Sequence, residues 1–272
     1  MSPGADALLV RAPNPGPLTG QGTNTWIFGH VQSVVIDPGP ADEGHLDRVL
    51  EMASRIGRVA IIACTHHHLD HLEGAERLCQ LTGAPLALHF RRALAHGELP
   101  LHDGDRLLVG DSALLAVHTP GHASDHVCFF DEESRVLFTG DHVLQGSTSL
   151  VVPPDGDMAA YLESLERTRG LGASRLLPGH GEPIEDAEAA IRELVAHRLA
   201  REQQILGLLR RGPATAPELV PAVYPGYPDA VLKMAAGTLQ AHLEKLEREG
   251  RARRLPGDGS GPFELVGGAP PG

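Results

Sequence analysis

The chain has 272 residues and a formal net charge of −12, which suits one large domain followed by a small one. Hydrophobic residues make up 42% and charged residues 21%, and these values exclude wholesale disorder. No apolar run reaches the roughly 18–20 residues of a membrane span, and no basic-then-apolar export signal opens the chain. We therefore expect no membrane contact. The three cysteines include no CxxC pair, so we also expect a cytoplasmic protein without disulfides.

Alternating or β-branched segments predict strands in the front part of the chain. These strands are Asn24–Phe28, Val31–Asp37, Val59–Cys64, Arg106–Val109, Leu114–His118, Val127–Phe130 and Arg135–Phe138. Helical patterns cover Asp42–Arg55, Glu73–Leu81 and Met158–Arg169, with Asp157 placed as the N-cap of the last. This order favours an α+β fold with two mainly antiparallel sheets flanked by helices over a doubly wound parallel sheet.

The tail has a different pattern, in which three helices precede a hairpin. The helices are predicted over Ile184–Arg211, Pro217–Val220 and Asp229–Glu249, and the hairpin pairs Arg251–Leu255 with Phe263–Val266. These elements outline a winged helix, and residues 267–272 are predicted to be a flexible end. Residues 1–191 hold 12 Lys/Arg against 26 Asp/Glu, whereas residues 192–272 hold 11 against 9, so the acidic charge lies in the front part.

The strongest chemical signal is the segment Cys64-Thr65-His66-His67-His68-Leu69-Asp70-His71, which follows an apolar strand and precedes a helix. His66 and His68 are two residues apart in extended chain, so their rings can project to the same side and share a cation. Asp70 and His71 begin the next helix and can reach a second site beside the first. Imidazoles and a carboxylate are the ligands that zinc prefers in proteins.

Three further segments repeat one pattern, in which a strand end is followed by glycine and a metal-ligand residue type. They are Thr119-Pro120-Gly121-His122, Thr139-Gly140-Asp141 and Leu177-Pro178-Gly179-His180-Gly181. Glycine beside each candidate ligand lets the backbone turn sharply and approach a metal. Each segment is a weak signal alone, but in this order after the histidine loop they form a specific set.

This set resembles the metallo-β-lactamase superfamily, whose HxHxDH motif is followed by His, Asp and His on later loops. The resemblance implies a four-layer αβ/βα sandwich over residues 1–190, a winged-helix-like domain over residues 191–266 and a site for two divalent metal ions. By the same resemblance, His66, His68 and His122 hold the first metal, Asp70, His71 and His180 hold the second, and Asp141 bridges them. Zinc is expected, although manganese or iron would fit the same residues.

Fainter marks resemble the β-lactamase-like endoribonuclease group, which also carries a C-terminal winged helix. They are Gly22-Thr23-Asn24-Thr25, Asp37-Pro38-Gly39 and His197-Arg198-Leu199-Ala200-Arg201-Glu202. Certain bacterial and fungal thioesterases are similar through the front part, and glyoxalase II and the persulfide dioxygenases share the histidine loop. Flavodiiron proteins are set aside because they carry Glu at the position of His68, and true β-lactamases because they are exported.

Residues beside the motifs receive separate interpretations. His67 points away from its neighbours on an extended loop and is predicted not to bind metal. His126 is a candidate substrate contact for an oxyanion or phosphate, with a positioning role as the alternative. Asp37 is predicted to order the metal loops through hydrogen bonds rather than to do chemistry.

Two metal ions that share a water would lower its pKa and supply a hydroxide, with Asp70 or Asp141 orienting it and accepting its proton. The first hypothesis is a phosphodiesterase, an endoribonuclease that cuts single-stranded RNA held by tail arginines such as Arg251, Arg253 and Arg254. The second is a thioester or lactone hydrolase that takes a small acyl substrate, with the tail capping the cleft or forming a homodimer. The third is a metal-dependent regulator that binds nucleic acid.

Overall fold

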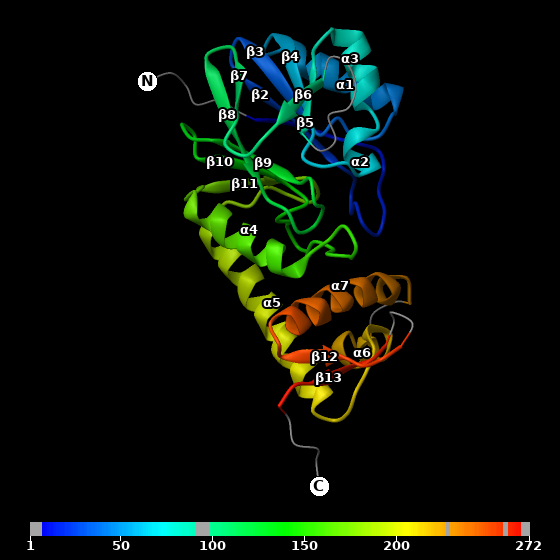
Figure 1. Cartoon of the computed structure of the whole chain (residues 1–272). Helices are drawn as coiled ribbons and strands as arrows, with labels where there is room; N and C mark the ends of the chain where they lie inside the picture. Colours follow the sequence, from blue (N-terminus) through cyan, green and yellow to red (C-terminus); the bar gives the residue numbers. More distant parts are fainter. Residues whose placement is uncertain (1–6, 91–97, 227–228, 258–260, 268–272) are drawn as a thin grey trace.

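The computed structural model describes residues 7–90, 98–226, 229–257 and 261–267, and within these residues two sheets pack face to face (Figure 1). The first sheet has the order β1-β2-β3-β4-β5-β6 and the second the order β11-β10-β9-β8-β7. The strands of the first sheet are β1 (Leu8–Arg11), β2 (Asn24–Gly29), β3 (Gln32–Ile36), β4 (Arg58–Ala63), β5 (Leu86–His89) and β6 (Glu98–Leu101). Those of the second are β7 (Arg106–Val109), β8 (Ser112–His118), β9 (Val127–Asp131), β10 (Val136–Gly140) and β11 (Arg175–Pro178).

The first sheet is mixed, so the prediction of two mainly antiparallel sheets is wrong for it. Strands β1 to β3 pair antiparallel, whereas β3, β4, β5 and β6 pair parallel. The physical reason is that α1 (Glu43–Ser54) and α3 (Ala75–Thr82) carry the chain back along the sheet between successive strands, which is the connection a parallel pair requires. In the second sheet only the β10–β11 pair is parallel.

Strand periodicity creates the four layers. On β2, Trp26 and Phe28 face the core between the sheets, whereas Ile27 faces the layer of α1 and α3. On β9, Phe129 faces the same inter-sheet core and Phe130 faces α4 (Met158–Gly170) and α5 (Ala187–Leu209). Because successive strand side chains point to opposite faces, each sheet buries both of its faces.

The helix α5 connects the sandwich to the tail as one continuous rod. It begins after Asp186, whose side chain caps the helix by accepting the amide of Ala189 at 3.0 Å. Ile184, predicted as the start of this helix, instead pairs with Leu176 beside β11. The first turns of α5 pack on the second sheet and its last turns on the tail, so the predicted domain boundary after residue 190 falls inside one helix.

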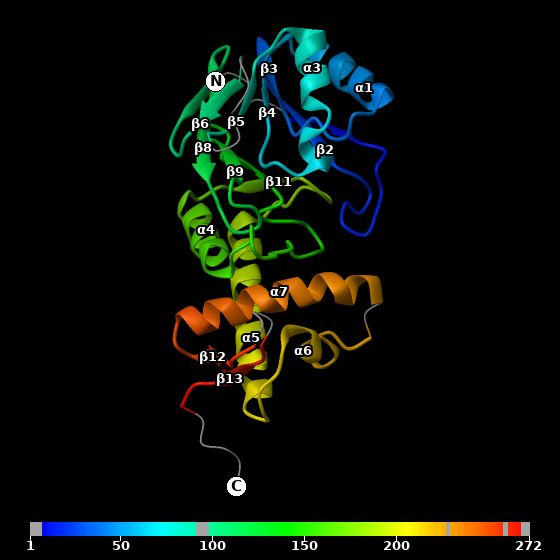
Figure 2. The ribbon, with the colours of Figure 1, turned by 45° about the vertical axis from the view of Figure 1, so that its right-hand side comes forward.

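The tail consists of α6 (Ala216–Val223), α7 (Asp229–Arg248) and the hairpin of β12 (Ala252–Arg254) and β13 (Phe263–Leu265). These elements share a core with the end of α5, in which Leu239, Leu243 and Phe263 are fully or almost fully buried. Figure 2 shows α7 crossing α5, with its axis below α4. Of the predicted flexible end, residues 268–272 lie outside the described residues. No described helix has the length and apolarity needed to cross a membrane.

A buried ion network holds α5, α7 and the start of the hairpin together. Glu202 on α5 is only 1% exposed, and its carboxylate lies 2.9 Å from Lys245 Nζ and 3.3 Å from Arg251 Nη1. His242 Nδ1 lies 3.7 Å away on the same helix as Lys245. Glu249 also pairs with Lys245 at 2.6 Å and with Arg251 at 3.2 Å, so loss of Glu202 would leave both cations with one carboxylate instead of two.

We therefore expect Glu202→Ala to lower the free energy of unfolding by about 1–3 kcal/mol, measured by urea denaturation. The matched control is Glu193→Ala, since Glu193 is exposed on the same helix and its loss should change stability by less than about 0.5 kcal/mol. Equal stability of the two variants would show that the network contributes nothing.

Candidate metal centre

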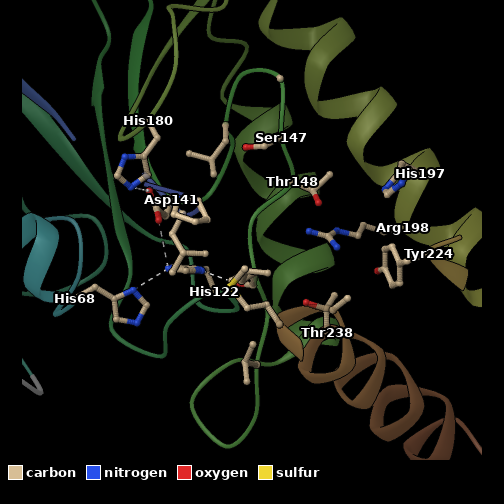
Figure 3. Close-up of a pocket in the computed structure, with 18 of the residues that line it drawn as sticks. His68, His122, Asp141, Ser147, Thr148, His180, His197, Arg198, Tyr224 and Thr238 are labelled. Carbon is tan, nitrogen blue, oxygen red and sulfur yellow. Dashed lines mark hydrogen bonds and ion pairs between the residues drawn. The ribbon is translucent and has the colours of Figure 1, made fainter. Parts of the chain in front are cut away.

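The predicted metal ligands lie on loops at four strand ends along one edge of the sandwich. β4 leads into the loop of His66 and His68 and then into α2 (Leu69–Leu72), which carries Asp70 and His71. The ends of β8, β10 and β11 supply the remaining three, which are His122, Asp141 and His180. Figure 3 shows His68, His122, Asp141 and His180 on one side of a cleft, pointing toward one another. The fold therefore brings all seven predicted ligands together.

Three histidines form the first cluster. His66 Nε2 lies 2.9 Å from His68 Nδ1, and His122 Nε2 lies 3.1 Å from the same His68 nitrogen. One nitrogen from each ring falls within 4.8 Å of the other two, so the three can contact a single ion. On its far side, His122 Nδ1 donates to the carbonyl of Leu150 at 2.6 Å, which fixes the tautomer and turns Nε2 toward the cluster.

The second cluster consists of Asp70, His71 and His180. His71 Nε2 and His180 Nε2 are 3.3 Å apart, and Asp70 Oδ2 lies 3.3 Å from the His180 nitrogen and 3.6 Å from the His71 nitrogen. These atoms also converge within 4.8 Å of one another. His71 is fully buried, whereas the Asp70 side chain is 31% exposed and reaches the cleft.

Asp141 lies between the two clusters and offers one oxygen to each. Its Oδ1 lies 3.4 Å from both His71 Nε2 and His180 Nε2, and its Oδ2 lies 3.7 Å from His122 Nε2. Oδ1 is buried and has no hydrogen-bond partner among the described residues. A buried carboxylate oxygen without a donor is costly, so this atom fits a position beside a cation. The donor set and its geometry therefore fit two metal ions.

The electrostatics of the centre also fit bound cations. Burial lowers the pKa of His66 well below its usual range and that of His68 to about 4, so both rings are neutral and present a lone pair. Burial alone would lower the pKa of His71, but the carboxylates of Asp37 and Asp141 raise it well above its usual range. Positive charge is stabilised at the second cluster, where the carboxylates gather.

Asp37 orders the metal loop, as the sequence predicts. Its carboxylate accepts the backbone amide of Thr65 at 2.8 Å, the Thr65 hydroxyl at 2.9 Å and His71 Nδ1–H at 2.9 Å. Asp37 lies just after β3 and has a φ of 52°, a left-handed backbone conformation that residues other than glycine seldom adopt. The bond to His71 leaves Nε2 of that ring free to face the second cluster.

His126 is fully buried and does not line the cleft, so it cannot contact substrate there as predicted. Its contacts fit the alternative, a positioning role. Its Nδ1 lies 2.8 Å from the Thr119 hydroxyl, and its Nε2 accepts the backbone amide of Asp141 at 3.2 Å. Burial lowers its pKa well below the usual range, which keeps Nε2 able to accept that bond. His126 thus holds the backbone of Asp141 from beneath.

His67 points away from the clusters, in agreement with its predicted orientation. Its Nδ1 lies 2.8 Å from the carboxylate of Asp125, which is 2% exposed, and its Nε2 lies 4.0 Å from that of Asp155. The Asp155 carboxylate in turn accepts the Ser124 hydroxyl at 2.6 Å. This set connects the histidine loop to the loop that follows His122.

The helix α5 and the tail supply one wall of the cleft. The sequence did not predict the residues of this wall as site residues. The cavity has a volume of about 650 Å³ and reaches from the metal clusters to α5 and α7. Its residues outside the seven ligands include Leu144, Leu150, Val152, His197, Arg198, Arg201, Tyr224, Met234 and Thr238. The one available signal was the spacing of His197, Arg198 and Arg201 on a helix, which places them along one side.

Comparison with known proteins identifies the family. Residues 18–180 match the model of the metallo-beta-lactamase superfamily, and residues 215–260 match that of the beta-lactamase associated winged helix domain. The chain belongs to the metallo-β-lactamase superfamily and is a metal-dependent hydrolase of that superfamily, with a C-terminal winged-helix domain.

Relatives of known sequence share both parts of the chain. The lactamase-like protein adaB of Aspergillus niger is 32% identical over 89% of this chain and 80% of its own. The atrochrysone carboxyl ACP thioesterase of Aspergillus chevalieri is 32% identical over 95% of this chain and 83% of its own. Among solved structures, a metallo-beta-lactamase family protein from Thermus thermophilus has a TM-score of 0.79, 28% identity, and coverage of 95% of this chain and 98% of its own.

Asp37 offers a test of the second cluster that leaves the proposed ligands in place. Because Asn cannot accept all three bonds that Asp37 accepts, Asp37→Asn should weaken binding of one metal ion by about 10–100-fold, while wild type holds two per chain. Elemental analysis and titration against a chelating dye measure both quantities. Asp47→Asn, an exposed change on α1, is the control. Unchanged affinities in Asp37→Asn would remove its assigned role.

Proposed function

We propose that this protein hydrolyses small acyl thioesters, using two metal ions, zinc in the first instance, held by the seven residues above. The observation that carries the proposal is the cleft. Its volume of about 650 Å³ lies in the range of small-molecule pockets, and one end holds the metal clusters while the rest is bounded by the tail. A polar reaction centre beside a partly apolar chamber suits an acyl group attached to a reactive carbonyl.

The chamber is lined by groups that suit an acyl chain. Leu144, Leu150 and Val152 come from the loop between β10 and α4, and Met234 comes from α7. Tyr224 adds an aromatic wall at the end of α6. Since both the sandwich and the tail contribute, the tail caps the chamber. The thioesterase from Aspergillus chevalieri is similar over both parts, and this likeness supports the proposal.

The RNA hypothesis loses support at the hairpin of the tail. Among the tail arginines expected to hold RNA, Arg251, Arg253 and Arg254 would have to offer free positive charge to phosphates. Each of the three forms ion pairs with carboxylates of the tail itself. The pairs are Arg251 with Glu202 and Glu249, Arg253 with Glu264, and Arg254 with Glu244 and Glu247. These three arginines are therefore neutralised by neighbouring acids.

In the proposed reaction, His66, His68 and His122 would hold one metal ion, Asp70, His71 and His180 the other, and Asp141 would contact both. Such ions supply a Lewis acid for the thioester carbonyl and a water of lowered pKa. Water adds to the carbonyl carbon, the carbon–sulfur bond breaks, and an acid and a thiol leave.

Among the two candidate catalytic carboxylates, Asp70 is the better placed to take the proton of the attacking water, because its side chain is 31% exposed at the cleft. Asp141, 13% exposed, is held from beneath by His126. The chain supplies no thiolate for a covalent route from Cys64 or Cys128. Both are buried, and burial raises the pKa of each thiol, that of Cys128 to about 12.

The proposal predicts the substrate class directly. Zinc-loaded protein should release thiol from the N-acetylcysteamine thioester of pentanoic acid, detected with a thiol reagent. A single-stranded RNA oligomer should remain intact, and a γ-lactone should react more slowly than the thioester. Protein stripped with a chelator is the control. Cleavage of RNA without thiol release would overturn the proposal.

Asp141 tests whether turnover depends on the shared carboxylate. Asp141→Asn replaces the carboxylate that would contact both metal ions by a neutral amide, so kcat should fall at least about 100-fold while circular dichroism and thermal unfolding stay near wild type. Asp111→Asn, an exposed change in the turn before β8, should leave kcat unaltered. Full activity in Asp141→Asn would exclude it from the reaction.

A further inference from the structure

Two arginines of α5 line the cleft without any carboxylate partner. Arg198 is 2% exposed, and Arg201 is partly buried. In the part of the chain that the structure describes, no aspartate or glutamate forms an ion pair with either guanidinium. Figure 3 shows Arg198 extending from α5 into the region opposite His180 and Asp141. These two cations therefore lie on the wall of the cleft that faces the metal clusters.

Their local contacts satisfy the guanidiniums only in part. Arg198 donates from Nη2 to the carbonyl of Ser149 at 2.5 Å and lies 5.2 Å from the ring centroid of Tyr161. Arg201 donates from Nη1 to Gln204 Oε1 at 2.6 Å and to the carbonyl of Val223 at 2.9 Å, and it lies 4.4 Å from the ring centroid of Tyr224. The Nε atoms of both are buried and have no partner among the described residues.

The neighbouring acid does not supply the missing charge. Glu202 follows Arg201 in sequence, but its carboxylate binds Lys245 and Arg251 inside the tail. On the cleft wall, the Asp155 carboxylate is held by Ser124 and faces His67. A buried guanidinium without a counterion carries a desolvation penalty, which the aromatic contacts offset only in part. A ligand with negative charge would remove that penalty.

We propose that Arg198 and Arg201 form an anion-binding subsite of the cleft, which selects thioesters carrying a carboxylate or phosphate remote from the scissile bond. This inference rests on the proposed thioesterase function. The guanidinium fork suits both anions because it can donate two parallel hydrogen bonds. The carbonyl lies at the metal end while the anion lies against α5. The anion has two chemical sources, the far end of the acyl chain or the phosphate of a phosphopantetheine thiol.

Four synthetic thioesters separate the two sources. Pentanoyl and glutaryl N-acetylcysteamine differ in the acyl carboxylate, whereas pentanoyl pantetheine and pentanoyl 4′-phosphopantetheine differ in the phosphate. In zinc-loaded wild type, kcat/KM for one anionic compound should exceed that of its neutral match by about ten-fold or more, the effect of one charge-assisted hydrogen bond. Preference within the first pair assigns an acyl carboxylate, and preference within the second assigns the phosphate.

Substitutions then connect the preference to the two arginines. Arg198→Met and, separately, Arg201→Met should reduce the anionic-to-neutral ratio of kcat/KM about ten-fold, and Arg198→Lys should restore part of it. Arg192→Met, an exposed change on the same helix outside the cleft, should keep the wild-type ratio. The ratio of kcat/KM for the anionic and the neutral thioester separates anion recognition from the hydrogen bond that Arg198 donates to the carbonyl of Ser149. Loss of that hydrogen bond would lower kcat/KM for both thioesters and leave their ratio unchanged.

The outcomes also separate this inference from the function beneath it. Thiol release from all four compounds at equal kcat/KM, or a ratio unchanged in both arginine variants, overturns the anion subsite and leaves the thioesterase function standing. Absence of thiol release from every compound overturns the thioesterase function itself. A direct check is isothermal titration of metal-free protein with glutarate and with 4′-phosphopantetheine, in which binding by wild type and loss in Arg198→Met support the subsite.

Discussion

One carboxylate, that of Asp37, connects the fold to the metal centre. It joins the turn after β3 to Thr65 at the end of β4 and to His71 on α2, so two neighbouring strands and the first helical turn share one anchor. The position of His71 then fixes the distances to His180 and Asp141, which come from the other sheet. Asp37 is buried and has a left-handed backbone conformation, which an aspartate adopts only at a cost in free energy. The hydrogen bonds and packing around Asp37 must offset this cost.

The second constraint is the rigidity of α5. A continuous helix begins on the second sheet and ends in the tail core, so residues near its middle keep a fixed position relative to the strand ends. Arg198 uses this position to hold the carbonyl of Ser149, while the Ser149 hydroxyl donates to the carbonyl of Asp141. The tail is therefore part of the same hydrogen-bonded structure that carries the candidate metal ligands, and a movement of α5 would displace Ser149 and with it the backbone of Asp141.

The sequence predicted the family, the sandwich with its winged helix and the enzyme class, and the comparisons confirm these three. It could do so because the HxHxDH ligands are local, and because the later ligands each follow a glycine at a strand end. The sequence could not predict whether strands such as β4 and β5 pair parallel or antiparallel, because their apolar pattern is compatible with either direction. His126 was misplaced for a related reason: spacing from His122 says nothing of which side of the chain faces the core.

Charge shows most clearly what a sequence count cannot reveal. A count of arginines treats all of them alike. In the described structure, Arg253 and Arg254 of the hairpin pair with nearby glutamates, whereas Arg198 and Arg201 of α5 form no ion pair with a carboxylate. A chain of net charge −12 repels anions at long range, but that repulsion is screened beyond about 10 Å in salt, whereas a buried guanidinium acts at contact. The same protein can therefore discourage polyanions at its surface and hold a single anionic group inside the cleft, which is the combination that the proposed thioesterase function requires.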